Sequence, residues 1–173
     1  GCAGVMVPQV DDAEAARTLV RMMRYGSSGM GFSPSTPGAE YGTRGVAGHL
    51  IQQPEETVLI CQIEKLSASQ QAADIAAVEG VDGIVLGPVD LAVAMGSNDP
   101  TSVEVMDVCR QVIAASATAE KAAGLFLTDL SKSAGWQAFG ANIFVFGSDQ
   151  SFLMNAAKAA LKIFGKSKEL PHE

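Results

Sequence analysis

The stretch that decides the fold is residues 83–96, GIVLGPVDLAVAMG. It opens with a short, continuously apolar run, which is typical of a strand in a parallel sheet that is covered on both faces. Gly87 and Pro88 then favour a turn, and the carboxylate of Asp90 follows that turn directly. Because burying an unpaired charge is costly, a carboxylate at the end of such a strand needs a partner.

Four further apolar runs of the same kind lie on either side of this stretch, and a helical pattern follows each of them. With residues 83–87, the predicted strands are residues 4–9, 57–64, 125–128 and 143–147. Capping-box patterns predict helix starts at three pairs: Asp11 with Glu14, Ser67 with Gln70, and Thr101 with Glu104. The helix after Thr101 is expected to end at Gly124, and the last helix to begin at a cap on Asp149 and end near Gly165.

Five consecutive βα units therefore make up one α/β domain over residues 1–173. Right-handed crossovers leave two arrangements open: a doubly wound open sheet, or part of a (β/α)₈ barrel. A complete barrel takes about 250 residues, so this chain alone cannot close one. Residues 26–56 are rich in Gly, Ser and Pro and are expected to form an irregular loop, either plain surface or a lid over substrate; residues 166–173 form a polar tail.

The composition argues for small-molecule chemistry. The formal net charge of -7 argues against nucleic acid and anionic membranes as partners. No apolar run approaches the roughly 20 residues of a membrane helix. The three cysteines are far apart and are expected to be reduced, and we expect a cytoplasmic protein. The abrupt start on a strand leads us to expect further residues upstream of Gly1 in the native protein.

Two carboxylates are predicted to meet at the carboxyl ends of neighbouring strands. Gln62 and Glu64 lie on the same side of their strand, and Asp90 follows the next strand along the chain. A divalent cation, Mg²⁺ or Mn²⁺, would satisfy Glu64 and Asp90 together. The alternative is structural: Glu64 caps a neighbouring helix, and Asp90 caps the short turn over residues 91–96.

Other polar residues at strand ends carry weaker signals. They are Asp11 and Asp12, which resemble helix caps, Thr128 with Asp129, and Ser148 with Asp149. His49 and His172 are lone histidines, of a kind that more often faces solvent than takes part in catalysis. No phosphate-binding or nucleophile-elbow motif follows any predicted strand.

Several segments together resemble the HpcH/HpaI aldolase family, the class II, metal-dependent pyruvate aldolases typified by 4-hydroxy-2-oxoheptanedioate aldolase. They are VLICQIEKLSA (58–68), IAAVEGVDGIVLGPVDLAVAMG (75–96), ANIFVFGSD (141–149) and GVMVPQVDDAEAARTLVRMMRY (4–25). The pairing of Q-I-E with G-P-x-D-L about two dozen residues later is specific. The resemblance covers almost the whole chain and corresponds to units 4–8 of a TIM barrel.

The resemblance implies a site as well as a fold. Glu64 and Asp90 would be the metal ligands, with Mg²⁺ or Mn²⁺ expected and Co²⁺ or Zn²⁺ as possible substitutes. Gln62 would lie beside the substrate as a catalytic and binding residue, and backbone N–H groups in the turn from Gly87 through Pro88 and Val89 to Asp90 would hold a carboxylate. The implied reaction is aldol cleavage or condensation of 4-hydroxy-2-oxo acids through a metal-stabilised enolate, with pyruvate and an aldehyde as partners.

A trimer or hexamer is the implied assembly. An apolar stripe on the last helix would pack either on a neighbouring subunit or in this chain's own core. Its residues are Phe152, Leu153, Ala156, Ala160, Leu161 and Phe164.

The chain also departs from the family pattern. It has no second or third unit, which in the family supply the histidine of proton transfer and a substrate-binding arginine. Gly26 and Ser27 stand where the family has prolines, and no arginine follows until Arg44. A truncated, non-catalytic relative that binds a metal, an oxo acid or other subunits is therefore the alternative. A receiver-type phosphoacceptor domain is disfavoured because the fifth strand ends Phe146–Asp149 without a lysine.

Overall fold

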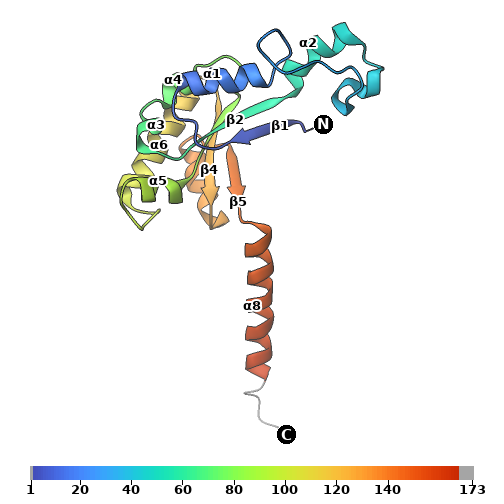
Figure 1. Cartoon of the computed structure of the whole chain (residues 1–173). Helices are drawn as coiled ribbons and strands as arrows, with labels where there is room; N and C mark the ends of the chain where they lie inside the picture. Colours follow the sequence, from blue (N-terminus) through green and yellow to red (C-terminus); the bar gives the residue numbers. More distant parts are fainter. Residues whose placement is uncertain (1, 168–173) are drawn as a thin grey trace.

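Five parallel strands form a single sheet in the computed structural model, which describes residues 2–167 (Figure 1). The strands are β1 (Gly4–Val7), β2 (Val58–Ile63), β3 (Gly83–Leu86), β4 (Ala122–Leu127) and β5 (Ile143–Phe146). Their order in the sheet is β1-β2-β3-β4-β5, so every strand pairs with its neighbours in sequence. A doubly wound sheet reverses its strand order, whereas a barrel does not. The partial TIM-barrel prediction is therefore confirmed, and the open doubly wound alternative is wrong.

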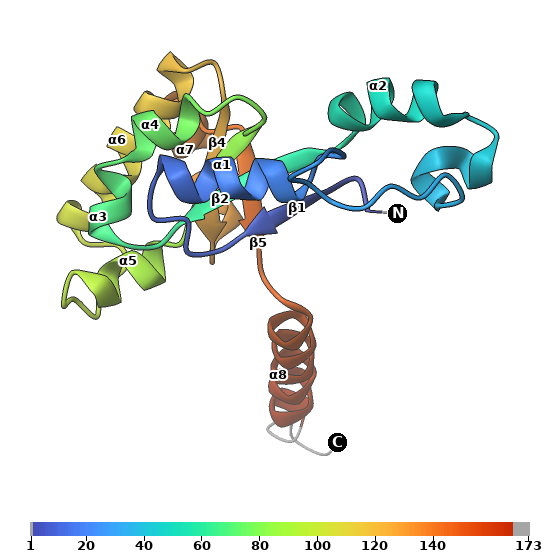
Figure 2. The same ribbon diagram turned by 45° about the horizontal axis from the view of Figure 1, so that its top comes forward.

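Helices connect the strands, and all of them except α2 and α8 gather on one side of the sheet (Figure 2). They are α1 (Ala13–Met22), α2 (Val46–Glu56), α3 (Leu66–Ser69), α4 (Ala72–Ala76), α5 (Pro88–Ala94), α6 (Val103–Thr118), α7 (Ser133–Ala138) and α8 (Asp149–Ser167), with short 3₁₀ turns η1 (Pro37–Gly42) and η2 (Leu130–Lys132). The core lies between the sheet and these helices, where alternate strand residues such as Leu59, Cys61 and Ile63 are fully buried. The other face of the sheet is only half covered by the described residues, and Val58 is 43% exposed there.

The amino-terminal ends of the strands are tied together by polar side chains. Asp82, just before β3, accepts a hydrogen bond from the Leu59 N–H through Oδ2 at 2.8 Å. Asn142, just before β5, repeats the arrangement by accepting from the Ala123 N–H at 2.9 Å. These bonds satisfy backbone donors at the start of each strand pair, where a parallel ladder has not yet begun.

Several predicted helix boundaries are wrong because one residue competes with its neighbour for the capping position. The α1 cap is Asp12, whose Oδ1 accepts from the Ala15 N–H at 2.8 Å, and not Asp11. Ser102 rather than Thr101 caps α6, and that helix ends at Thr118, because Gly124 belongs to β4. The Ser67–Gln70 pair caps nothing, since its segment splits into the short helices α3 and α4. Ser148, which accepts from the Ser151 N–H, stands before α8 in place of Asp149.

The segment from residue 26 to 56 contains more regular structure than the sequence predicted. It holds the kinked turn η1 and the eleven-residue helix α2, which tolerates Pro54 in its interior. Both lie apart from the other helices (Figure 2). The sequence did not predict this helix, because the glycines and prolines of the segment have low helix propensity.

The last helix, α8, leaves the end of β5 and extends away from the sheet (Figure 1). Leu153 and Leu161 are 72% and 69% exposed, so the predicted apolar stripe is not buried in the core of this chain. Of the predicted polar tail, residues 168–173, which include His172, lie outside the described residues. Among residues 2–167, no helix has the length and apolar character that crossing a membrane requires.

Candidate metal and substrate site

The end of β2 presents two polar side chains on the face of the sheet that the helices leave open. Cys61 and Ile63 point into the core, so the alternation of the strand places Gln62 and Glu64 on the opposite face. The Gln62 Nε2 donates a hydrogen bond to Glu64 Oε1 at 2.7 Å. The amide therefore fixes the orientation of this carboxylate while leaving its own carbonyl oxygen free of any partner within the described residues.

The turn after β3 brings a second carboxylate to the same place. Ile63 pairs with Leu86 in the sheet, and the Gly87 N–H donates to the Ile63 carbonyl at 3.2 Å, so Gly87 lies beside the end of β2. A Cβ atom on Gly87 would lie 2.8 Å from Asp90 Oδ2 and 3.5 Å from both Gln62 Nε2 and Glu64 Cγ. All three side chains thus surround one glycine, and the absence of a Cβ leaves the space between them.

Neither carboxylate is a helix cap, in contrast to the structural alternative. Asp90 lies inside the first turn of α5, whose cap residue is Gly87, and Glu64 accepts only from Gln62 and from the Gln9 N–H. Asp90 is exposed, and its carboxylate has no hydrogen bond or ion pair with any of residues 2–167. The pair is therefore available to a ligand.

Among residues 2–167, no cationic side chain forms an ion pair with Glu64 or Asp90. Burial and then repulsion from Asp90 raise the pKa of Glu64 above its usual value, although the Gln9 N–H and the more distant charge of Lys65 act in the opposite direction. Lys65 pairs instead with Asp11, at 2.7 Å. Two carboxylates that border the same glycine, next to an amide, form a donor set that suits a hard divalent ion. The residues present therefore fit a divalent metal.

The protein alone would supply few ligands to such an ion. Within the described part of the chain, no group of three or more His, Cys, Asp or Glu side chains is placed to hold a metal. The remaining coordination positions would fall to water and substrate, which is the arrangement that Mg²⁺ usually adopts.

Sequence reasoning missed the contribution of the loop after β1. Gln9 has a φ of 57°, which is uncommon for a residue other than glycine, and its N–H donates to Glu64 Oε2 at 3.1 Å. The next residue, Val10, donates its N–H to the Gln62 carbonyl at 3.1 Å. The loop thus holds both ends of the Gln62–Glu64 segment. A sequence pattern does not predict this backbone donor, because the position of the Gln9 N–H depends on the path of the folded chain.

The other candidate residues do not join the site. Asp129 caps η2 by accepting from the Ser131 N–H at 2.9 Å. His49 was expected to face solvent, and this expectation is wrong. It is only 3% exposed within α2, where its Nε2 lies 3.0 Å from the Tyr25 hydroxyl. Burial follows from the helix that the sequence did not reveal.

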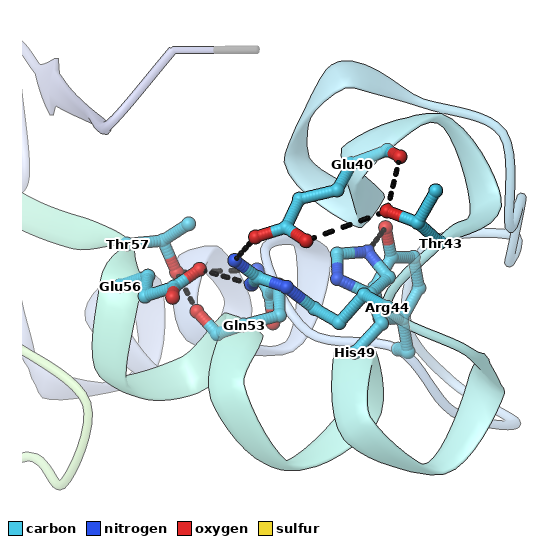
Figure 3. Close-up of polar contacts among 8 residues, drawn as sticks. Glu40, Thr43, Arg44, His49, Gln53, Glu56 and Thr57 are labelled. Carbon is cyan, nitrogen blue, oxygen red and sulfur yellow. Dashed lines mark hydrogen bonds and ion pairs between the residues drawn. The ribbon is translucent and has the colours of Figure 1, made fainter.

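A second polar cluster, also unforeseen, surrounds His49 (Figure 3). The Arg44 guanidinium pairs with Glu56 and, at 3.0 Å, with Glu40. These pairs join the carboxyl end of α2 to η1, and Gln53 ties α2 to the Met23 carbonyl at 2.9 Å. The cluster therefore holds the segment 26–56 in one conformation, and its ion pairs are satisfied internally.

Comparison with known proteins gives separate evidence on the family of the chain. The family model for HpcH/HpaI aldolase/citrate lyase matches residues 1–156. The chain belongs to this family. Among individual family proteins, the hydroxypyruvate/pyruvate aldolase of Delftia acidovorans is 37% identical over 175 residues, which cover 93% of this chain and 60% of that protein.

Solved structures of the HpcH/HpaI family share the fold. The HpcH/HpaI aldolase from Desulfitobacterium hafniense superposes with a TM-score of 0.86 at 27% identity, over 99% of this chain and 66% of that one. The citrate lyase beta subunit from Mycobacterium tuberculosis, solved with oxaloacetate and magnesium, has a TM-score of 0.54 at 16% identity, over 86% of this chain and 57% of that one, and shows the fold alone. The chain spans less than two thirds of the length of these proteins.

Proposed function

We propose that this chain carries the metal and 2-oxo-acid site of an aldolase that cleaves or forms the carbon–carbon bond of 4-hydroxy-2-oxo acids, with pyruvate and an aldehyde as partners. The observation that carries the proposal is the convergence of Gln62, Glu64 and Asp90 around Gly87. Membership of the HpcH/HpaI family and a relative named hydroxypyruvate/pyruvate aldolase support the same reaction class.

Glu64 and Asp90 would hold the divalent cation, with Mg²⁺ or Mn²⁺ as the best match to two carboxylate ligands. The magnesium in the M. tuberculosis citrate lyase beta subunit supports this choice. When bound, the cation would supply Lewis-acid polarisation of the keto group, which stabilises the negative charge that develops during aldol cleavage.

The chain's own residues would position the metal ligands and the substrate. Gln62 holds the Glu64 carboxylate through its Nε2, so its carbonyl oxygen remains available to a polar group of the substrate. Val89 and Asp90 lie in the first turn of α5, where backbone N–H groups have no acceptor within the helix. These two N–H groups would bind the carboxylate of the oxo acid; Pro88 has no N–H and contributes only the shape of the turn.

Assembly belongs to the same proposal. The exposed apolar residues of α8 and the two sheet edges, β1 and β5, favour a homo-oligomer, since exposed apolar patches and unpaired edges usually mark contact surfaces. A trimer or hexamer is the form that we propose. A non-catalytic protein that binds a metal or other subunits is the second candidate, and it would use the same two carboxylates, Glu64 and Asp90.

Two measurements on the same protein test the proposal. Mn²⁺ binding is measured by titration calorimetry, and pyruvate release from a 4-hydroxy-2-oxo acid is measured with and without Mn²⁺. We expect Glu64→Ala and Asp90→Ala each to lose Mn²⁺ binding and Mn²⁺-dependent pyruvate release. Asp74 is an exposed carboxylate of α4, and Asp74→Ala should retain both activities.

The outcomes separate the two candidates. Metal-dependent pyruvate release that is lost in both variants supports the aldolase. Mn²⁺ binding without pyruvate release favours the binding protein. Unchanged Mn²⁺ binding in both variants would overturn the site itself.

A further inference from the structure

A cavity of about 560 Å³ lies between the sheet and the helices α6 and α7, and is lined by neither Gln62, Glu64 nor Asp90. Its floor is apolar and comes from Leu125, Leu127 and Met106. Trp136 and Phe139 of α7 form an aromatic wall, with ring centroids 6.1 Å apart. The volume is within the range of about 300–1,000 Å³ that is typical of small-molecule sites.

The apolar floor of the cavity belongs to the opposite face of the sheet from Gln62 and Glu64, although Phe126, at an alternate position of β4, also lines the cavity. Leu125 is in register with Leu86 and Ile63, which point toward the helices. Gln62 is in register with Val85 and Gly124, which occupy the alternate positions. A ligand in the cavity would therefore not contact Gln62 or Glu64 through the sheet, although Pro88 and Val89 border both spaces.

The charges around the cavity favour an anion, although the chain as a whole carries a formal net charge of -7. Arg110 and Lys132 line it together with one carboxylate, Asp129, which already accepts from the Ser131 N–H. The other two hollows that we find on the described residues are lined by Asp12 and Glu14 and by more carboxylates than cations. Two cations in the lining distinguish this cavity from both, although Arg110 also forms an ion pair with Asp107 outside the lining.

Arg110 is held in place and retains unused donors. Its guanidinium carbon lies 5.9 Å from the Trp136 ring centroid and 5.1 Å from that of Phe139, within the range of cation–π contact. Its Nη1 donates to Asp107, while the buried Nε has no acceptor within residues 2–167. Such a guanidinium, next to aromatic rings, matches a planar carboxylate joined to an aromatic group.

We propose that this cavity is a second small-molecule site, which binds an aromatic monocarboxylate with its ring against Trp136 and Phe139 and its carboxylate toward Arg110 and Lys132. The chain offers a direct reporter, because Trp136 is its single tryptophan. The probe is 3-phenylpropionate, and its neutral amide, 3-phenylpropionamide, is the matched control.

The experiment is a fluorescence titration of the full chain with excitation of Trp136. We expect a saturable change with a Kd of about 1 mM or tighter, which is reasonable for a ligand of this size. The amide should bind about tenfold more weakly, and Arg110→Met should raise the Kd of the acid by about tenfold, because each loses the charge-assisted contact. Lys158→Met, on the exposed side of α8, should leave the Kd unchanged.

Two further variants keep the test decisive. The Lys132 side chain is exposed, so we expect Lys132→Met to fold. A weaker Kd for the acid in this variant supports the site even if circular dichroism shows that Arg110→Met does not fold. Glu64→Ala should bind the acid as the wild type does. A linear response, equal Kd values for acid and amide, an unchanged Kd in Lys132→Met, or loss of binding in Glu64→Ala would each overturn the proposal.

Discussion

At the scale of single residues, Gly87 is the position on which the candidate metal site depends. It provides the space in which Asp90, Gln62 and Glu64 approach one another. The G-P-x-D pattern showed that a turn and a carboxylate would be there. The contacts around the glycine follow from the pairing of β2 with β3. The paired residues are 23 positions apart in sequence, so a local pattern does not reveal the pairing.

Replacing Gly87 with alanine tests this role. The new Cβ would lie 2.8 Å from Asp90 Oδ2, so the flexible carboxylate must move while the backbone need not. We expect Mn²⁺ affinity to fall about tenfold, about 1.4 kcal/mol, with little change in the midpoint of thermal unfolding. Calorimetric titration and a melting curve measure the two effects. Gly135→Ala, where a Cβ would have no neighbour within 4 Å, is the control, and equal Mn²⁺ affinity in both variants would contradict the assignment.

Cysteine reactivity tests burial at the same scale. Cys61 and Cys109 are buried, and burial raises their pKa values to about 11 and about 12. A raised pKa leaves little thiolate at pH 8, whereas Cys2 is exposed. Iodoacetamide at pH 8 should therefore modify only Cys2 in the native protein and all three cysteines in guanidinium, as read by mass spectrometry. Rapid native modification of Cys109 would show that the core between α6 and the sheet is open.

At the scale of elements, the strand starts depend on side chains that the sequence analysis left out. Asp82 and Asn142 each bond a backbone N–H of the neighbouring strand. Asp82 also donates its own N–H to the Leu59 carbonyl at 2.9 Å, so one residue closes the ladder in both directions. A polar residue before an apolar run looked like ordinary loop composition, because its partner is far away in sequence.

Asp82→Ala tests this element. Removing the side chain leaves the Leu59 N–H without an acceptor, which should lower the free energy of unfolding by about 1–2 kcal/mol. Urea unfolding measures the difference, and Asp82→Asn, which retains a side-chain carbonyl at the same position, should recover most of it. Asp74→Ala is the matched surface control. If Asp82→Asn lowers the free energy of unfolding as much as Asp82→Ala does, the charge of Asp82 and not its hydrogen bond stabilises the fold.

At the scale of the whole molecule, the described residues leave three surfaces uncovered: the open sheet face, the edges β1 and β5, and helix α8. Uncovered apolar surface favours association, because its burial releases about 25 cal/mol per Å². The helix is the easiest of the three to alter without disturbing the sheet, since it extends away from it (Figure 1).

The paired substitution Leu153→Glu with Leu161→Glu tests the homo-oligomer. Both side chains are more than two thirds exposed, so the monomer fold should tolerate the charges while an apolar contact between subunits should not. Light scattering after size exclusion should show a trimer or hexamer for the wild type and a smaller species for the variant, with unchanged circular dichroism. A monomeric wild type would refute the proposed assembly, and Lys158→Glu controls for added negative charge.

The sequence by itself determined the five strands, their parallel character and the two carboxylates at their carboxyl ends, because apolar runs and turn residues are local properties. Only the tertiary structure decided the strand order, the helix within residues 46–56, the Gln9 N–H on Glu64 and the cavity beside Arg110. The helix was missed because glycine and proline weaken its local signal. The other three features depend on contacts between residues that are distant in the chain, and such contacts are set by how the elements pack.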